Sequence, residues 1–337
     1  MEIFITGING FIGSNLARYL TQLGHRVSGS VRKSSDLSFL HGLKVNLFTG
    51  DISDEGFLVN AFQGQEIIYH IAALASDWGT KKAFDDINVH GTKNVAHAAL
   101  KAGVRRLIFV SSTAVYGLTG YRNRSENDVR PENNFPYAIA KQAAEDWLKN
   151  FSQEANLPIT IIQPANIFGP HDRTFFIKFA RGLEKGMVSF IDHGVAWTCP
   201  TYVENLAEAL WLAATNERAI GETFIISDGL EITWHQYVEK ICRALELPLP
   251  RRSVRFGFAY ALAGILEIIF KLFRIKKEPP ISRYRIRNFG LDYHFSIDKA
   301  KTILGYSPQI DLDEGIRRTV QWYKQFRKEK ANEGSIG

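Results

Sequence analysis

The sequence is poor in cysteine, and the two it has exclude common kinds of cysteine site. Cys199 and Cys242 are the only cysteines among 337 residues. Neither has the spacing typical of a zinc ligand set or a redox pair, so no metal site is expected. A reduced, cytoplasmic compartment is the default for such a chain. No secretory leader fits either, since an apolar strand begins at residue 2 and a glycine turn follows at once.

The sequence also lacks internal repeats, low-complexity tracts and nucleic-acid-binding motifs. Its basic charge is uneven: the stretch from Arg243 to Arg287 holds eleven basic and three acidic residues, in a chain of net charge +6. Without a nucleic-acid motif, this charge favours an anionic substrate, an anionic membrane surface or a solvated basic face, and no nucleic-acid partner is expected. The hydrophobic content of 45% is ordinary for a globular protein.

Short β-rich runs alternate with helical stretches over the first two-thirds of the chain. We expect strands at Glu2–Thr6, Arg26–Val31, Val45–Thr49, Ile67–Ile71, Leu107–Ser111, Thr160–Gln163 and Thr223–Ile226. The intervening and later helices are expected at Phe11–Leu23, Asn88–Ala102, Ala138–Glu154, Phe175–Lys185, Asn205–Thr215 and Trp234–Leu245. This alternation predicts an α/β fold with a Rossmann-type, doubly wound parallel sheet. We expect a dinucleotide-binding domain over 1–170, to which strands near 195–227 return, and a smaller, interleaved C-terminal substrate-binding lobe mainly over 171–330.

One apolar stretch, 256–273, stands apart in the predicted lobe. Glu267 and Lys271 interrupt it at a spacing of four, which predicts that they share one face of a helix, and Arg274, Lys276 and Lys277 follow it. These features fit a helix packed over an apolar substrate, or one lying on a membrane surface, better than a membrane span. Peripheral membrane contact through 256–277 is therefore left open.

Three glycines give the first strong indication of function. Gly7, Gly10 and Gly13 follow the first strand and open the first helix, which is the context that a dinucleotide fingerprint requires. The first glycine permits a tight turn, the second lets the backbone approach a pyrophosphate, and the third allows close packing of helix and strand. The phosphates would lie at the helix N-terminus, where free N–H groups favour negative charge. The glycines predict a nicotinamide dinucleotide site.

Tyr137 and Lys141 give the second indication. They lie four apart on a predicted helix and therefore share a face. An ammonium close to a phenol favours the phenolate and lowers its pKa toward working pH, which makes the tyrosine a usable acid or base. Ser111 and Ser112 end an apolar strand, at the edge of a parallel sheet where ligands bind. A serine hydroxyl there can donate to a substrate oxygen.

With these residues, the sequence resembles an extended short-chain dehydrogenase/reductase over essentially its whole length. The motifs that carry the resemblance are Gly7-x-x-Gly10-x-x-Gly13, Asp51-Ile52, His70-Ile-Ala-Ala73, Asn88-Val-His-Gly-Thr92, Ser111-Ser112-Thr113, Tyr137-x-x-x-Lys141 and Pro164-Ala-Asn-Ile-Phe-Gly-Pro170. The resemblance implies that Tyr137 is the acid/base, that Ser112 holds the substrate oxygen, and that Lys141 holds the nicotinamide ribose. Asn88 would support the site through a helix or a water relay. The remaining cofactor contacts are expected at Gly7, Asn9, Gly10, Phe11, Ile12, Gly13, Asp51, Ile52, Ala72, Ala73 and Pro164.

The end of the second strand bears on cofactor choice. Enzymes that use NAD usually place an acid there for the ribose 2′-hydroxyl, whereas this chain has Val31, Arg32 and Lys33. The missing acid removes repulsion against a 2′-phosphate, and Arg32 could pair with that phosphate. NADP is therefore favoured, with NAD or dual use as the alternative.

At several positions the sequence differs from the family's sugar-nucleotide enzymes, and these differences narrow the range of expected substrates. Dehydratases of this kind resemble one another in an Asp-Glu pair after the catalytic hydroxyl residue, where this chain has Thr113 and Ala114. Thr198 stands where epimerases commonly have an arginine, although Asn166 matches the epimerase pattern. The C-terminal third resembles the 3β-hydroxysteroid dehydrogenase branch, which includes sterol-4-carboxylate 3-dehydrogenases and 2-alkyl-3-oxoalkanoate reductases. That branch implies a small hydrophobic alcohol or ketone as substrate, an apolar entrance to the substrate site at 256–273, and a homodimer.

Two other functions stay open at this point. A sugar-nucleotide 4-epimerase would use the same hydride transfer transiently. A non-catalytic, dinucleotide-sensing protein would need only the glycine turn, and the complete Ser112, Tyr137 and Lys141 set argues against it.

Overall fold

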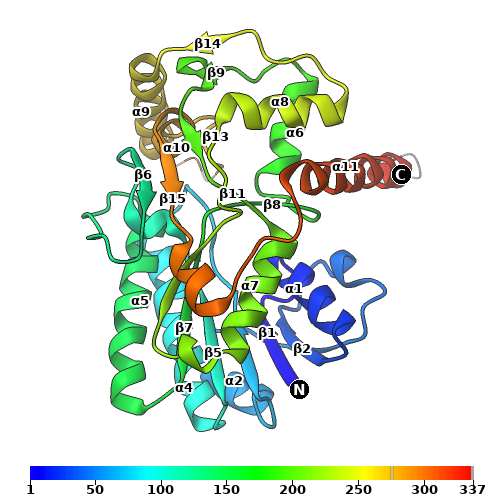
Figure 1. Cartoon of the computed structure of the whole chain (residues 1–337), viewed down its shortest axis with the longest axis vertical. Helices are drawn as coiled ribbons and strands as arrows, with labels where there is room; N and C mark the ends of the chain where they lie inside the picture. The colour runs from blue at the N-terminus through cyan, green and yellow to red at the C-terminus, as the bar shows by residue number, and fades with distance from the viewer. Residues whose placement is uncertain (274, 276, 335–337) are drawn as a thin grey trace.

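The computed structural model describes residues 1–273, 275 and 277–334, and its centre is a seven-stranded sheet between two layers of helices (Figure 1). Every strand of the sheet runs parallel to its neighbours. In sheet order the strands are β12 (Thr223–Ile226), β7 (Ile159–Pro164), β5 (Arg106–Val110), β4 (Ile67–His70), β1 (Glu2–Thr6), β2 (Arg26–Val31) and β3 (Val45–Thr49). The predicted Rossmann-type sheet is confirmed, with strand ends shifted by one residue in β4, β5 and β7.

Helices cover both faces of the sheet, which is why its central strands read as almost continuously apolar. On one face, α1 (Phe11–Gln22) and α7 (Val203–Thr215) bury residues such as Leu16, Leu20 and Leu206 against the sheet. On the other face, α2 (Glu55–Ala61), α4 (Gly91–Lys101) and α5 (Pro136–Ala155) bury residues such as Val95 and Leu148. The predicted helix at 88–102 begins differently: α3 (Lys81–Phe84) leads into a π-helical segment η2 (Asp85–His90), and α4 follows.

The later part of the chain gathers above the carboxyl ends of the strands (Figure 1). Its helices are α6 (Phe176–Glu184), α8 (Trp234–Leu245), α9 (Phe256–Leu272), α10 (Arg283–Gly290) and α11 (Leu312–Gly334). Short paired strands link them: β6 (Tyr121–Arg124) with β15 (Tyr293–Phe295), β8 (Asn166–Phe168) with β11 (Pro200–Tyr202), β9 (Phe190–Ile191) with β14 (Ser253–Val254), and β10 (Trp197–Thr198) with β13 (Ile232–Thr233). β12 returns to the edge of the main sheet. The division into domains at residue 170 stays a prediction.

The apolar stretch 256–273 forms α9, which carries its two charged residues four apart as expected, but the two side chains have separate partners. Glu267 is buried and accepts hydrogen bonds from the backbone N–H of Arg283, at 2.7 Å, and from its Nε, at 2.8 Å. Lys271 is exposed, with its Nζ 5.9 Å from the ring centre of Trp78. Two of the basic residues predicted to flank the helix, Arg274 and Lys276, lie outside the described residues. Across the described part of the chain, none of the helices is long and apolar enough to cross a membrane.

Candidate active site

A cleft of about 620 Å³ opens where six strands of the sheet end and the later helices begin. Its walls combine the loops that follow β1, β2, β3, β4, β5 and β7 with residues of α8 and α10. The predicted site residues that line it are Gly7, Asn9, Gly10, Phe11, Ile12, Arg32, Asp51, Ile52, Ala72, Ala73, Ser112, Tyr137 and Pro164. The other three predicted site residues do not line the cleft; they are Gly13, Asn88 and Lys141.

The glycine turn has the shape that a pyrophosphate needs. Gly7 has a φ of +70°, which favours glycine, and a Cβ placed on Gly13 would lie 2.3 Å from the carbonyl oxygen of Gly7. Gly10 precedes α1 without any side-chain hydrogen bond to cap the helix, and the first turn of α1 holds no acid. The first-turn N–H groups therefore remain available to an anion. The residues present fit a dinucleotide.

The adenosine end of the cleft is basic. Arg32, Lys33 and Asp51 line a hollow at the ends of β2 and β3. The nearest acid on the connecting loop, Asp36, is already engaged: its carboxylate accepts from Nη1 of Arg173 at 2.6 Å and from the N–H of Ser38 at 2.9 Å. Within the described residues, the side chain of Arg32 forms no ion pair. This arrangement offers two cations to the ribose 2′ position, beside the exposed carboxylate of Asp51 at the end of β3.

Tyr137 stands at the start of α5 with its phenol facing Ser112. Pro136 begins the helix, where a proline costs no hydrogen bond. Burial raises the pKa of Tyr137 to about 12, and a hydrogen bond with Ser112 lowers it in part. The direction is opposite to the one expected from Lys141, because desolvation of the phenolate outweighs any nearby positive charge here. The phenol is therefore a proton donor at neutral pH.

Lys141 lies one turn further along α5 and is buried. Its Nζ donates a 2.8 Å hydrogen bond to the carbonyl oxygen of Val110 and lies 4.7 Å from the ring centre of Phe109. Burial lowers the pKa of Lys141 to about 8, while the neighbouring carboxylate of Glu145 raises it. The ammonium is thus held beside the end of β5, close to the serines that follow it.

Asn88 supports the site through a loop. Its Oδ1 accepts from the N–H of Leu74 at 2.8 Å, and its Nδ2 donates to the carbonyl of the same residue at 3.1 Å. Leu74 belongs to the loop after β4 that lines the cleft. The buried amide therefore holds the shape of that loop, and the support through a helix or a water relay that the resemblance implies stays a prediction.

The other half of the cleft has a wall that the sequence revealed only at Asn166. Its lining residues are Asn166, Thr174, Phe175, Trp234, Tyr237, Tyr284 and Asn288. Asn166 belongs to the motif at 164–170, whereas no local motif marks the other residues, which meet through tertiary folding alone. The expected entrance at 256–273 does not line the cleft, because α10 lies between α9 and the cavity and supplies Tyr284 and Asn288.

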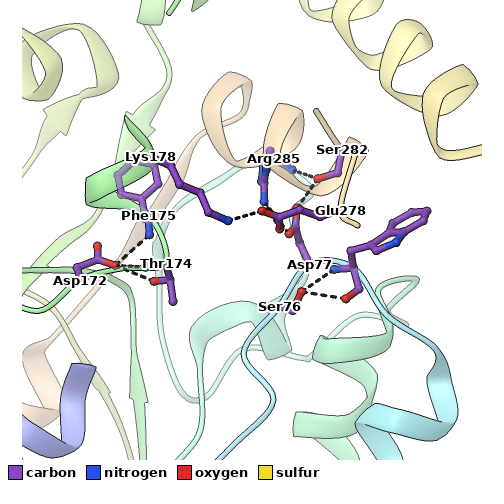
Figure 2. A network of polar contacts seen from close by, with 10 residues as sticks. Ser76, Asp77, Asp172, Thr174, Phe175, Lys178, Glu278, Ser282 and Arg285 are labelled. Atoms are coloured by element: carbon purple, nitrogen blue, oxygen red, sulfur yellow. Dashed lines mark hydrogen bonds and ion pairs between the residues drawn. The ribbon is translucent and has the colours of Figure 1, made fainter. Parts of the chain in front are cut away.

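An ion-pair network closes the rim beside this wall (Figure 2). Asp77, in the loop after β4, accepts from Ser282 Oγ at 2.5 Å and from Nη2 of Arg285 at 3.0 Å. The same guanidinium donates to Glu278 at 2.7 Å, and Lys178 of α6 also binds Glu278. The two cations at this rim are therefore neutralised by carboxylates of the protein.

The chain is similar to known proteins over most of its length. Residues 3–227 match the NAD dependent epimerase/dehydratase family. A 2-alkyl-3-oxoalkanoate reductase of Stenotrophomonas maltophilia is 28% identical over 94% of this chain and 98% of its own. A decarboxylating sterol-4-alpha-carboxylate 3-dehydrogenase of Mus musculus is 28% identical over 97% of this chain and 92% of its own. Among solved structures, a Thermotoga maritima UDP-glucose 4-epimerase with UDP-glucose has a TM-score of 0.77 at 25% identity, covering 97% of this chain and 99% of its own.

Proposed function

This chain belongs to the NAD-dependent epimerase/dehydratase family, and on that premise we propose that it interconverts a secondary alcohol and a ketone on a hydrophobic, sterol-like or long-chain lipid substrate. It is an NAD(P)-dependent enzyme, as its named dehydrogenase and reductase relatives indicate. Beyond family membership, the proposal names the class of substrate, which is a hydrophobic alcohol or ketone rather than a sugar nucleotide.

The observation that carries the proposal is the charge of the cleft wall. Among the lining residues that the structure describes, Arg32 is the one cation, and it lies at the adenosine end. A sugar nucleotide would bring a diphosphate into the other half, where charge-assisted hydrogen bonds from arginine or lysine would be required. That half instead presents aromatic side chains such as Phe175, Trp234 and Tyr284. The nearby cations Lys178 and Arg285 are bound to carboxylates.

A 4-epimerase is the second candidate, and Asn166 is the observation that favours it. Its Nδ2 faces Thr198 Oγ1 at 3.1 Å and Asn288 Oδ1 at 3.5 Å, so the amide is held inside the protein. Thr198, at the position where epimerases commonly have an arginine, is fully buried and contributes no charge. One neutral amide is a poor partner for a charged diphosphate. It suits an apolar ligand that presents a single hydroxyl better.

The proposed chemistry assigns one task to each residue. NAD(P), when bound, accepts or supplies the hydride. Ser112 donates a hydrogen bond to the substrate oxygen and holds it against Tyr137. In ketone reduction the phenol of Tyr137 gives its proton to that oxygen, and in alcohol oxidation the phenolate takes it back. Lys141 would orient the nicotinamide ribose from behind, where Val110 holds its ammonium.

We propose NADP(H) as the preferred cofactor, with NAD(H) as the alternative. Arg32 and Lys33 face the hollow at the end of β2, and Asp36 is occupied by Arg173. A 2′-phosphate would gain an ion pair there, whereas the acid that usually binds the 2′-hydroxyl of NAD is missing from the end of β2. A homodimer and a cytoplasmic location also remain proposals.

The proposal is tested by nicotinamide absorbance with NADP⁺ or NAD⁺ and three substrate classes: hydroxysteroids, long-chain 3-hydroxyacids and UDP-sugars. We expect net formation of reduced cofactor with a lipid alcohol, faster with NADP⁺. Conversion of a UDP-sugar to its epimer without net reduction would establish the second candidate instead. Tyr137→Phe serves as the control, because any signal that persists in it does not come from this site.

A further inference from the structure

The outer side of α9 is a continuous apolar surface. It is formed by Phe258, Leu262, Ile265, Ile268, Ile269 and Leu272, all exposed, and continued by Phe273 and Ile275. We call this surface the α9 face. Exposure is high for single side chains: 66% for Ile268 and 74% for Leu272. Large side chains of this kind are usually buried, so a row of them along one helix indicates a contact surface.

The side chains on the inner side of the same helix find their apolar and charged partners within the protein. Ala259 and Ala263 pack in a small cluster with Ile191 and Ile286 of α10. The one acid of α9, Glu267, points to this side and is bound by Arg283. The α9 face therefore carries no negative charge of its own helix, and α9 lies at an outer edge of the molecule (Figure 1).

Exposed cations flank both ends of the α9 face. Arg251, Arg252 and Arg255 precede the helix, and Lys271 and Lys277 lie at its other end. Asp192 accepts a 3.1 Å hydrogen bond from the backbone N–H of Phe256 at the start of the helix, and Glu278, which follows its other end, is bound by Lys178 and Arg285. An apolar face with a basic flank is the pattern of helices that lie in a membrane interface, where the apolar side enters the lipid and the cations meet anionic headgroups.

We propose that the α9 face docks on the surface of an anionic phospholipid bilayer, with the helix axis lying in the plane of the interface. Its 17 residues give a contact about 25 Å long. A second copy of the chain fits less well. Two antiparallel α9 helices would bring the arginines of one copy against the lysines of the other, whereas anionic headgroups complement both ends.

The docked helix would bring the cleft close to the lipid, and this part rests on the proposed lipid-like substrate. α9 packs directly on α10, whose Tyr284 and Asn288 line the cleft. At the other end, Phe270 of α9 meets the ring of Trp78, with centroids 6.3 Å apart, in the loop that follows Ala75 of the cleft wall. Packed helices are separated by about 8–10 Å. A single helix layer would therefore separate the bilayer from the substrate.

The test is co-sedimentation of the whole chain with vesicles of phosphatidylcholine alone or mixed with phosphatidylserine. We compare the wild type with the double variant Ile268→Glu/Leu272→Glu. Val129→Glu is the matched control, because Val129 is an exposed apolar residue, at 83%, in the loop before α5. The wild type and the control should bind the phosphatidylserine vesicles, less so at high salt. The double variant should bind about tenfold less, since two charges enter the apolar face.

Activity toward a soluble short-chain ketone, without vesicles, separates this proposal from the proposed function. All three proteins should share the same rate, because neither α9 side chain lines the cleft. Vesicle binding without any such activity would overturn the proposed function and leave the docking. Absent binding of the wild type, or equal binding of the double variant, would overturn the docking. Self-association that only the double variant abolishes, without vesicle binding, would assign the α9 face to a second copy and overturn it as well.

Discussion

The Nζ of Lys141 donates a 2.8 Å hydrogen bond to the carbonyl oxygen of Val110, the last residue of β5. This bond ties α5, which carries Tyr137, to the strand that ends just before Ser111 and Ser112. The three residues of the proposed reaction are thus held on two rigid elements joined by one buried contact. Such preorganisation is what acid–base catalysis at a fixed distance requires.

Replacing Tyr137 by phenylalanine should remove turnover and leave cofactor binding intact. The phenol is the only proton donor assigned to the substrate oxygen, and losing such a donor typically costs about a hundredfold or more in kcat. The phenyl ring fills the same space, so the fold should not change. Steady-state rates and quenching of protein fluorescence by reduced cofactor measure the two effects. A variant rate comparable to that of the wild type would refute the assignment.

Lys141 should give the free enzyme a pH dependence near its lowered pKa. Burial sets that pKa at about 8, so the side chain loses its charge as pH rises through this value. Since kcat/KM for the cofactor reports groups of the free enzyme, it should fall above about pH 8. Lys141→Met should give a low and flat profile. A bend near pH 8 that persists in Lys141→Met would have to come from another group.

Arg32→Ala should weaken NADP⁺ far more than NAD⁺. Losing a charge-assisted pair with a 2′-phosphate should raise KM for NADP⁺ by about tenfold, which corresponds to roughly 1.4 kcal/mol. NAD⁺ lacks that phosphate, and its KM should change little. Parallel assays with both cofactors give the ratio. An equal loss for both would indicate that Arg32 supports the loop rather than the phosphate.

Gly13→Ala should damage both the fold and the cofactor site. The added Cβ would lie 2.3 Å from the carbonyl oxygen of Gly7, a backbone atom that cannot move alone. Overpacking of this kind costs about 1–3 kcal/mol. Gly257→Ala is the matched control, because no atom lies within 4 Å of its added Cβ. Thermal unfolding and cofactor titration should separate the two variants; equal behaviour would contradict the tight turn.

His70 should make the protein sensitive to acid. Its ring lies between the hydroxyls of Thr6 and Thr92, each at 2.9 Å, and burial lowers its pKa from 6.5 to about 3. The unfolded chain therefore binds a proton between these values and the folded chain does not. The stability that the neutral ring contributes is complete above pH 6.5 and declines as pH falls, by about 1.4 kcal/mol per pH unit.

The measurement is denaturant unfolding of the wild type and His70→Gln between about pH 7 and 4. His171, whose pKa burial lowers to about 4, contributes in the same direction to both proteins. The difference between their slopes isolates His70. Identical slopes would show that the ring is not kept neutral in the folded state.

The sheet and the cofactor half of the site could be predicted because their signals are local. Backbone sterics require glycine at a tight turn between a strand and a helix. The structure has this turn, with a positive φ at Gly7 and a close backbone approach at Gly13. The wall of the substrate half could not be predicted in the same way. Phe175, Trp234 and Tyr284 are far apart in the sequence and meet only when the later helices pack above the strands.

One expectation failed because a pairwise argument left out a larger effect. The charge of Lys141 suggests a lowered pKa for Tyr137, yet desolvation raises it. The burial of the phenol decides, and burial belongs to the tertiary fold. Glu267 and Lys271 do lie four apart on α9, but the spacing could not show that Arg283 binds Glu267 in a buried setting.

The most direct test of the central claim follows a deuteride. The enzyme is mixed with NADPH deuterated at the transferable position and with a long-chain or steroid ketone, and the product is analysed by mass spectrometry. The account predicts deuterium at the carbinol carbon, together with stoichiometric oxidised cofactor, and neither in Tyr137→Phe. An unlabelled lipid together with a UDP-sugar that is epimerised without taking up deuterium would contradict it, since the hydride would then be returned internally to the sugar.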